Sequence, residues 1–172
     1  MGRTRGRGAA VKTGVGIASG KKIMFIDADG SIKPPEIDRM SKELDKSDVV
    51  VSSKIHEKST VPKRQPASRI FVGRIFNFLA NSMFRIEMYD SLCGFKGFRR
   101  DAGKRIFGSL RSKRWVFDVE VLYLAKKFGY KVSVLPITWR HVGGSKIKAH
   151  TVIGIFLELL SLRISYTLCQ VR

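Results

Sequence analysis

Asp27 and Asp29 are the two residues whose type and spacing most directly suggest chemistry. They follow the apolar run 23–26, and Gly30 comes directly after them. A compact apolar run predicts a buried strand, so both carboxylates should emerge together at its carboxyl end. Hard cations prefer carboxylate oxygens, with phosphate oxygens completing the shell, so the pair predicts a Mg²⁺ or Mn²⁺ site. An ordinary acidic turn is the alternative, because short motifs often match by chance.

Three further segments carry polar groups that could complete such a site. Residues 90–98 combine Asp90, glycines that permit close backbone approach, and an apolar strand. Residues 114–120 place an Arg-Trp pair before two acids on a predicted helix, and residues 141–146 contain a Gly-Gly-Ser-Lys loop whose donors suit a diphosphate. Taken singly, the two acids could be surface residues, the tryptophan a core residue and the loop a hairpin turn.

The elements that must position these residues alternate along the chain. Strand, helix, strand is typical of a parallel sheet, so the order predicts an α/β fold, and a length of 172 residues fits one domain. Residues 55–66 are polar and contain proline, which predicts a mobile surface loop. We expect strands over 22–26, 48–52, 94–98 and 132–137, and helices over 9–19, 34–44, 68–84, 102–106 and 116–128.

The composition excludes several classes of protein and leaves the kind of partner open. A hydrophobic content of 44% argues against a disordered chain, and Cys93 and Cys169 are too few for a disulfide framework, which favours a reducing compartment. The net charge of +19 indicates an anionic partner, which could be nucleic acid, a phosphorylated small molecule or acidic lipid head groups. No secretory signal opens the sequence, and Glu158 and Arg163 interrupt the longest candidate for a transmembrane helix.

Five segments, taken together and in this order, resemble a known family. They are residues 5–14, 25–30, 90–98, 114–123 and 143–147. The resemblance is to family 2 glycosyltransferases with the GT-A fold, specifically the polyprenyl-phosphate sugar synthases. Among these the sequence looks most like the dolichyl-phosphate glucosyltransferases, and the dolichyl-phosphate mannose synthases share the same framework.

The resemblance implies an α/β fold of the GT-A, Rossmann-like kind, with a mostly parallel sheet flanked by helices. Residues 1–148 would form a partial GT-A domain, and residues 149–172 an amphipathic helix for a membrane interface or for oligomerisation. The strand and helix that normally open such a domain are not found ahead of residue 9, so the chain looks N-terminally truncated, through a wrong start codon, a split gene or a decayed copy. A sheet without its first strand would expose an apolar edge.

The implied reaction is inverting transfer of a hexose, with glucose favoured, to dolichyl or polyprenyl phosphate for glycan or glycoprotein assembly. The donor would be UDP-glucose or another nucleotide sugar. A phosphate monoester has a second pKa near about 6, so the acceptor is already an anionic nucleophile at neutral pH. The leaving diphosphate gains negative charge, which a bound Mg²⁺ or Mn²⁺ would neutralise.

The resemblance also assigns roles to single residues. It implies metal binding by Asp29 and Asp27, a catalytic or positioning role for Asp90 with Asp27, and binding of the lipid phosphate by Lys54 and Arg69. Contacts to the nucleotide sugar and its diphosphate fall to Gly6, Gly8, Arg140, Ser145 and Lys146. Support of the acceptor or sugar site falls to Arg114, Trp115, Asp118 and Glu120.

Two positions refine the expected activity. Gly73 stands where the mannose type has a serine, which favours the glucosyl type. Processive polysaccharide synthases carry Gln-x-x-Arg-Trp, and Arg111 replaces that glutamine here, which favours transfer of a single sugar.

Two helical stretches could contact a membrane. Residues 68–84 and 151–168 are apolar with interspersed arginines, which favours helices lying at a membrane interface, while packing in the core or in a homo-oligomer is the alternative. Together with the resemblance, this implies a peripheral contact with the cytoplasmic face of a membrane. A non-catalytic remnant that binds a membrane or a partner subunit is one rival function. A basic RNA-binding domain is less favoured because no recognition helix or aromatic platform is found, so no nucleic acid partner is expected.

Overall fold

The computed structural model describes residues 6–62, 66–87, 90, 93–140 and 149–168. Six helices and four strands lie in this described part, close to the ranges that the hydrophobic pattern predicts. In chain order they are α1 (Arg7–Ile17), β1 (Lys22–Phe25), α2 (Pro35–Glu43), β2 (Val49–Ser53), α3 (Ala67–Phe84), β3 (Lys96–Arg99), α4 (Arg100–Ser109), α5 (Phe117–Lys127), β4 (Val132–Pro136) and α6 (Ala149–Leu168).

The four strands form one mixed sheet in the order β1-β3-β2-β4. β3 pairs antiparallel with both β1 and β2, and β2 pairs in parallel with β4. Strands β1, β2 and β4 therefore run in one direction, as expected for a mostly parallel sheet, and β3 runs opposite to them. Because β3 inserts between β1 and β2, the strand–helix–strand unit formed by β1, α2 and β2 does not join neighbouring strands.

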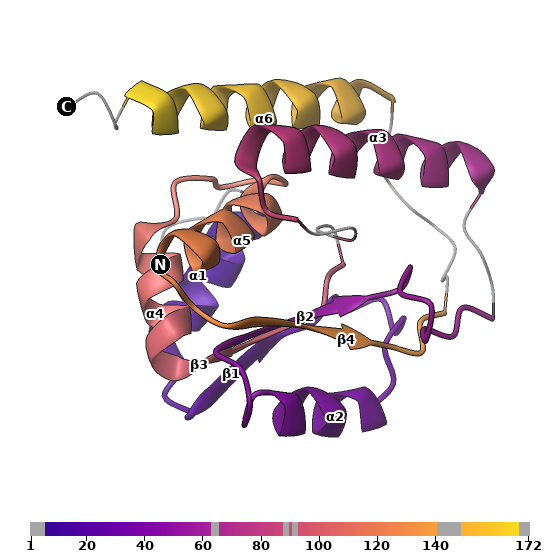
Figure 1. Ribbon diagram of the computed structural model, residues 1–172, viewed down its shortest axis with the longest axis vertical. Coiled ribbons are helices and arrows are strands. Elements are labelled where there is room, and N and C mark those ends of the chain that lie inside the picture. Colours follow the sequence, from indigo (N-terminus) through magenta and orange to yellow (C-terminus); the bar gives the residue numbers. More distant parts are fainter. Residues whose placement is uncertain (1–5, 63–65, 88–89, 91–92, 141–148, 169–172) are drawn as a thin grey trace.

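Helices cover both faces of the sheet, with α2 on one face and α1, α4 and α5 on the other (Figure 1). Successive residues of a strand point to opposite faces, and β2 follows this rule. Val49 and Val51 enter the large core beneath α4 and α5, while Val50 packs toward α2. A Cβ on Gly97 would lie 2.9 Å from a methyl carbon of Leu44, so this glycine lets α2 approach β3 closely.

Helices α3 and α6 lie side by side above the rest of the molecule (Figure 1). Phe76 of α3 and Phe156 of α6 make an edge-to-face contact with ring centroids 5.9 Å apart. α6 buries Leu159 and Leu162 on its inner face and exposes Ile153, Leu157, Leu160, Ile164 and Leu168 on its outer face. The expected amphipathic helix is therefore apolar on two faces. Among the helices of the described residues, none is both long enough and apolar enough to cross a membrane.

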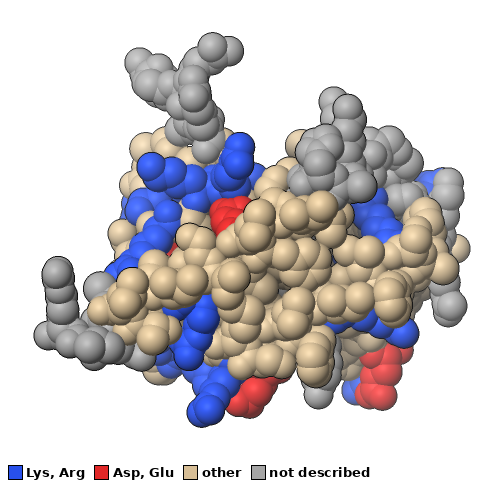
Figure 2. Space-filling view, turned by 90° about the horizontal axis from the view of Figure 1, so that it is seen from above, with Lys and Arg blue, Asp and Glu red and all other residues tan. Residues whose placement is uncertain are grey.

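The outer faces of these two helices form one surface. α3 adds the exposed side chains of Phe71, Val72, Ile75 and Phe78 to those of α6. Seen from above, a broad uncharged area runs across the molecule with Lys and Arg around it (Figure 2). We call the exposed apolar residues of α3 and α6 the α3/α6 face.

The expected division of the chain at residue 148, between a partial GT-A domain and a terminal helix, stays a prediction.

Candidate active site

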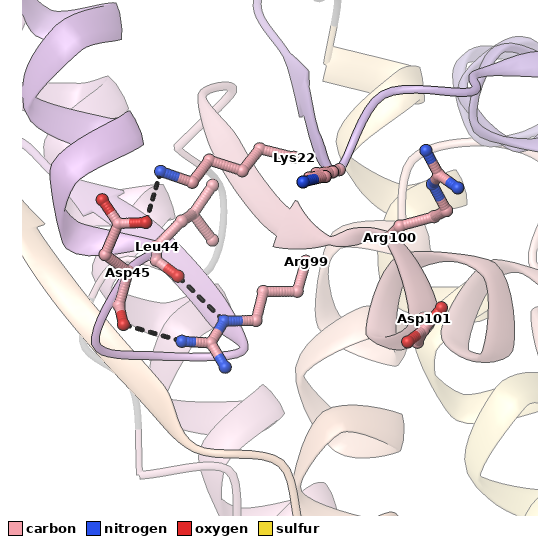
Figure 3. Close-up of a pocket in the computed structure, with 7 residues that line it drawn as sticks. Lys22, Leu44, Asp45, Arg99, Arg100 and Asp101 are labelled. Carbon is pink, nitrogen blue, oxygen red and sulfur yellow. Dashed lines mark hydrogen bonds and ion pairs between the residues drawn. The ribbon is translucent and has the colours of Figure 1, made fainter.

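A basic pocket of about 370 Å³ lies at the amino end of β1. Its cations are tied to nearby groups: Lys22 Nζ lies 2.6 Å from a carboxylate oxygen of Asp45, and Arg99 Nε donates to the Leu44 carbonyl oxygen at 2.9 Å (Figure 3). These contacts join the two residues that follow α2 to the first residue of β1 and the last residue of β3. The pocket contains none of the residues that the sequence singles out for chemistry.

The opposite end of β1 carries the two aspartates. After Phe25 the chain turns sharply, and Gly30 adopts a positive φ of 72°, which glycine accommodates without strain. One carboxylate oxygen of Asp29 accepts a 2.9 Å hydrogen bond from the Ser31 backbone N–H, which fixes the turn. The Asp29 side chain is exposed, so it is accessible to a ligand from solvent.

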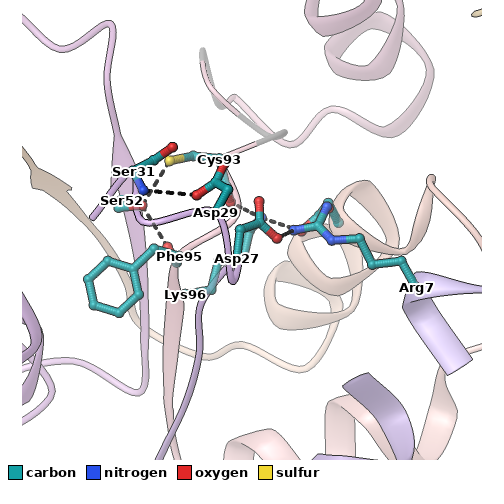
Figure 4. Close-up of polar contacts among 9 residues, drawn as sticks. Arg7, Asp27, Asp29, Ser31, Ser52, Cys93, Phe95 and Lys96 are labelled. Carbon is teal, nitrogen blue, oxygen red and sulfur yellow. Dashed lines mark hydrogen bonds and ion pairs between the residues drawn. The ribbon is translucent and has the colours of Figure 1, made fainter. Parts of the chain in front are cut away.

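Asp27 is the outer end of a chain of alternating charges (Figure 4). Arg7 Nη2 lies 2.6 Å from Asp27 Oδ1, and Arg7 Nη1 donates to Asp118 Oδ2 at 3.0 Å. The other oxygen of Asp118 pairs with Lys96 Nζ, which also donates to the Cys93 carbonyl oxygen at 2.7 Å. Lys96 and Asp118 are fully buried, so this pair fixes the arginine from below.

The charges around Asp27 bear on whether the pair can hold a metal. Burial raises the pKa of the Asp27 carboxyl, the Arg7 guanidinium opposes that rise, and the nearby Asp118 and Asp29 carboxylates add to it. A divalent cation would relieve the repulsion between Asp27 and Asp29. Within the described ranges, no group of three or more His, Cys, Asp or Glu side chains could hold a metal. Two carboxylates suffice for Mg²⁺ when water and substrate phosphates complete its shell, so the residues present fit this ion. Both carboxylates are exposed, and Asp27 is the one that pairs with Arg7.

Gly94 lets Asp27 and Arg7 come close to the backbone that precedes β3. A Cβ at this position would lie 1.9 Å from Asp27 Oδ2 and 2.8 Å from Arg7 Nη2. No side chain fits there unless both charged groups move. Gly94 is therefore required by the set of ion pairs that links Asp27, Arg7, Asp118 and Lys96, which we call the charge network.

Asp90 and Lys54 meet at the carboxyl end of β2, which is the same end of the sheet. The buried Asp90 accepts a 2.8 Å hydrogen bond from the Lys54 backbone N–H, and Lys54 Nζ lies 5.1 Å from the ring centroid of Trp139. Arg140 also reaches this end of the sheet, because its backbone N–H donates to the Ser31 carbonyl oxygen at 3.2 Å. Arg69 lies in the first turn of α3, which begins on the side toward which β2 runs (Figure 1). Ser145 and Lys146 lie outside the described residues.

Gly6 and Gly8 pack against the backbone that precedes α5. A Cβ on Gly6 would lie 2.3 Å from the Lys113 carbonyl oxygen, and one on Gly8 would lie 2.9 Å from Phe117 Cβ. Gly8 is also buried, so packing alone requires these glycines. Contacts from them to a diphosphate stay a prediction.

Within residues 114–120, the burial of the two acids and the tryptophan is the reverse of what each residue type suggests when it is taken singly. Asp118 and Glu120 are fully buried, so the alternative of surface acids is wrong. Trp115 has 38% of its surface exposed, so the alternative of a core tryptophan is wrong too. The side chain of Arg114 is also exposed. Asp118 supports the site through Arg7, and roles at the acceptor or sugar for any of the four stay predictions.

Arg7 and Lys96 are the two residues of this site to which sequence reasoning gave no role. Both stand inside quoted motifs. Lys96 carried a usable signal: a lysine within an apolar strand is rarely buried without a carboxylate partner. Nothing in the local sequence indicates that Arg7 bridges two aspartates 20 and 111 residues away.

Curated proteins with similar sequences include dolichyl-phosphate β-glucosyltransferases from several organisms. The chain is 33% identical over 153 residues to the dolichyl-phosphate β-glucosyltransferase of Homo sapiens, covering 84% of this chain and 47% of that protein. It is 32% identical over 183 residues to that of Saccharomyces cerevisiae, covering 96% of this chain and 54% of that protein. The chain thus spans about half the length of the curated relatives it matches.

Solved structures share the fold at lower sequence identity. Glucosyl-3-phosphoglycerate synthase from Mycobacterium tuberculosis, in complex with Mn²⁺, UDP-glucose and phosphoglyceric acid, superposes with a TM-score of 0.67 at 13% identity. That superposition covers 95% of this chain and 56% of the other. This likeness confirms the expected α/β fold with a sheet flanked by helices.

A protein-family model described as Glycosyl transferase family 2 matches residues 1–107 of this chain. The matched part contains both aspartates of the turn after β1, Arg7, Asp90 and Lys96. It therefore includes most of the charge network as well as the fold around it. Because the match extends over more than half of the 172 residues, this chain belongs to glycosyl transferase family 2.

Proposed function

We propose that this chain transfers glucose from UDP-glucose to dolichyl phosphate with inversion at the anomeric carbon. The observation that carries the proposal is the accessible Asp29 beside Asp27 at the carboxyl end of β1, in a chain whose relatives are dolichyl-phosphate β-glucosyltransferases. Carboxyl ends of strands in open α/β sheets are where ligands usually bind. Glycan or glycoprotein assembly would consume the product.

In the proposed reaction, one group of residues acts on the leaving diphosphate and another on the lipid phosphate that attacks the sugar. Asp29, with Asp27 nearby, would hold Mg²⁺ or Mn²⁺, which when bound stabilises the negative charge of the departing diphosphate. Arg140, Ser145 and Lys146 would bind the same diphosphate. Lys54 and Arg69 would bind the lipid phosphate, whose own negative charge makes it a competent nucleophile. Asp90 would then orient the acceptor or sugar, because little help from a general base is needed.

The α3/α6 face would bring the enzyme to the lipid acceptor. Phe78 and Leu157 are 69% and 62% exposed, and Arg74 and Arg163 lie on the same two helices. Apolar side chains with flanking cations suit the boundary between head groups and acyl chains of an anionic membrane. We propose peripheral attachment at the cytoplasmic face, where nucleotide sugars are available.

The direct test is a transfer assay with membranes, dolichyl phosphate, Mg²⁺ or Mn²⁺ and a panel of labelled nucleotide sugars. Formation of labelled dolichyl phosphate sugar from UDP-glucose, lost when the metal is chelated, is the expected result. Binding to vesicles without transfer from any sugar, unchanged by Asp29→Ala, would instead identify a non-catalytic membrane-binding relative. Salt-sensitive RNA binding without any response to nucleotide sugar would support the basic RNA-binding alternative.

Replacing Gly94 by alanine should weaken binding of UDP in the presence of Mg²⁺ by about tenfold, because the added methyl group displaces Asp27 from Arg7 and supporting contacts of metal ligands have effects of this size. Isothermal titration of UDP measures the change. Gly108→Ala is the matched control, since a Cβ there would meet no atom within 4 Å. Equal affinity in Gly94→Ala and the control would show that the close packing is not needed.

Replacing Leu157 by aspartate should lower binding to vesicles of anionic phospholipid by about tenfold or more, since burying one leucine contributes about 1.5–3 kcal/mol. Co-sedimentation with the vesicles measures this. Ile17→Asp is the control, because Ile17 is 80% exposed on α1 and lies outside the α3/α6 face. If Leu157→Asp leaves vesicle binding unchanged but dissociates an oligomer, the face is an oligomer interface.

A further inference from the structure

Glu120 connects α6 to the segment that precedes α5, which we call the 110–116 segment. Its buried carboxylate accepts hydrogen bonds from the backbone N–H groups of Arg111 at 2.8 Å and Ser112 at 2.7 Å. The Tyr166 hydroxyl of α6 donates to the same carboxylate at 2.6 Å. One buried charge on α5 thus binds both the segment and α6.

Two more contacts join α6 to the same segment. The Trp115 backbone N–H donates to Glu158 Oε2 at 3.3 Å, and the Arg111 guanidinium donates to the Ser165 carbonyl oxygen at 3.1 Å. The Arg111 guanidinium also lies over the Tyr166 ring, 4.5 Å from its centroid. Contacts therefore run along the segment from Arg111 to Trp115.

The other side of the 110–116 segment holds the start of α1. The backbone N–H groups of Gly8 and Ala9 donate to the carbonyl oxygens of Arg114 and Lys113, both at 3.0 Å. The first N–H groups of a helix have no partner within the helix, so these two bonds fix where α1 begins. Arg7 is the residue before them, and it contacts Asp27 and Asp118.

We propose that α6 acts as a positioning element: through Tyr166, Glu158 and the 110–116 segment, it fixes the start of α1 and so aims Arg7 at Asp27. The path is continuous, because each step from α6 to Asp27 is a hydrogen bond, an ion pair or a stretch of one or two peptide bonds. Nothing in this path requires α6 to touch a substrate. Tyr166 and Glu158 are therefore positioning residues.

Amide hydrogen exchange followed by NMR tests the proposal without depending on nucleotide binding. In Tyr166→Phe, and separately in Glu158→Ala, exchange at Gly8 and Ala9 should accelerate at least about tenfold, the factor that corresponds to about 1.4 kcal/mol. Exchange at Ser52, whose N–H donates to the Phe95 carbonyl oxygen in the core, should stay unchanged. Tyr130→Phe is the matched control for loss of a tyrosine hydroxyl.

Each other outcome contradicts the proposal. If Arg111 and Ser112 exchange faster while Gly8 and Ala9 do not, the 110–116 segment does not transmit the position of α6. If Ser52 accelerates as much as Gly8 in both variants, α6 only stabilises the whole fold. Titration with UDP in the presence of Mg²⁺ is a second readout. If Arg7 no longer contacts Asp27 in the correct position, both variants should bind UDP at least about fivefold more weakly than Tyr130→Phe does.

Discussion

Replacing Asp29 by asparagine is expected to lower the proposed glucosyl transfer to dolichyl phosphate by about 100-fold or more, because a cation held by Asp29 would supply several kcal/mol of charge stabilisation to the leaving diphosphate. Asparagine keeps the size of the side chain and one oxygen that can accept the Ser31 N–H, so the turn after β1 should persist. The loss should therefore fall on transfer and on metal-dependent UDP binding. Fold stability should be unchanged.

The design separates this effect from a general loss of negative charge. Asp38→Asn is the matched control, since Asp38 is an exposed acid on α2. Transfer is measured with labelled UDP-glucose over a series of Mg²⁺ and Mn²⁺ concentrations, and thermal unfolding is measured in parallel. Transfer by Asp29→Asn at the level of Asp38→Asn would rule out metal binding by Asp29.

Much of the architecture could be predicted because hydrophobic periodicity is a local property. All but the last residue of the apolar run 23–26 lie in β1, the Val-Val-Val of 49–51 lies in β2, and the helix predicted over 68–84 is observed as Ala67–Phe84. The order of the strands could not be predicted in this way. The position of β3 between β1 and β2 depends on contacts between segments far apart in the sequence, and the pattern within each strand does not encode them.

In the candidate site, too, contacts between residues close in sequence could be predicted, and contacts between distant segments could not. Asp27 and Asp29 could be found because two residues on one turn must be neighbours in space. Asp118 lies fully buried beneath Arg7, and its partners Arg7 and Lys96 come from the start of the chain and from β3. Its support of the acceptor or sugar site stays a prediction. Side-chain type alone gave no reason to pair these three. Glu120 shows the same limit, because its contact with Tyr166 spans 46 residues.

Replacing Asp118 by asparagine should lower the free energy of unfolding by about 3–5 kcal/mol, the usual effect of leaving one member of a buried ion pair without its partner. Lys96 would then be a buried cation next to Arg7 with no carboxylate between them. Urea unfolding followed by the fluorescence of Trp115 and Trp139 measures the change.

A double variant shows whether charge, and not lost packing, causes this loss. Asp118→Leu combined with Lys96→Met replaces both buried charges by apolar side chains, and such exchanges are often close to neutral. We expect the double variant to regain most of the stability that Asp118→Asn loses. It should still bind UDP with Mg²⁺ weakly, because Arg7 has lost the carboxylate that holds it beneath Asp27. A double variant as unstable as Asp118→Asn would mean that packing around Asp118 matters more than its charge. One that binds UDP like the unmodified chain would mean that Arg7 needs no anchor below it.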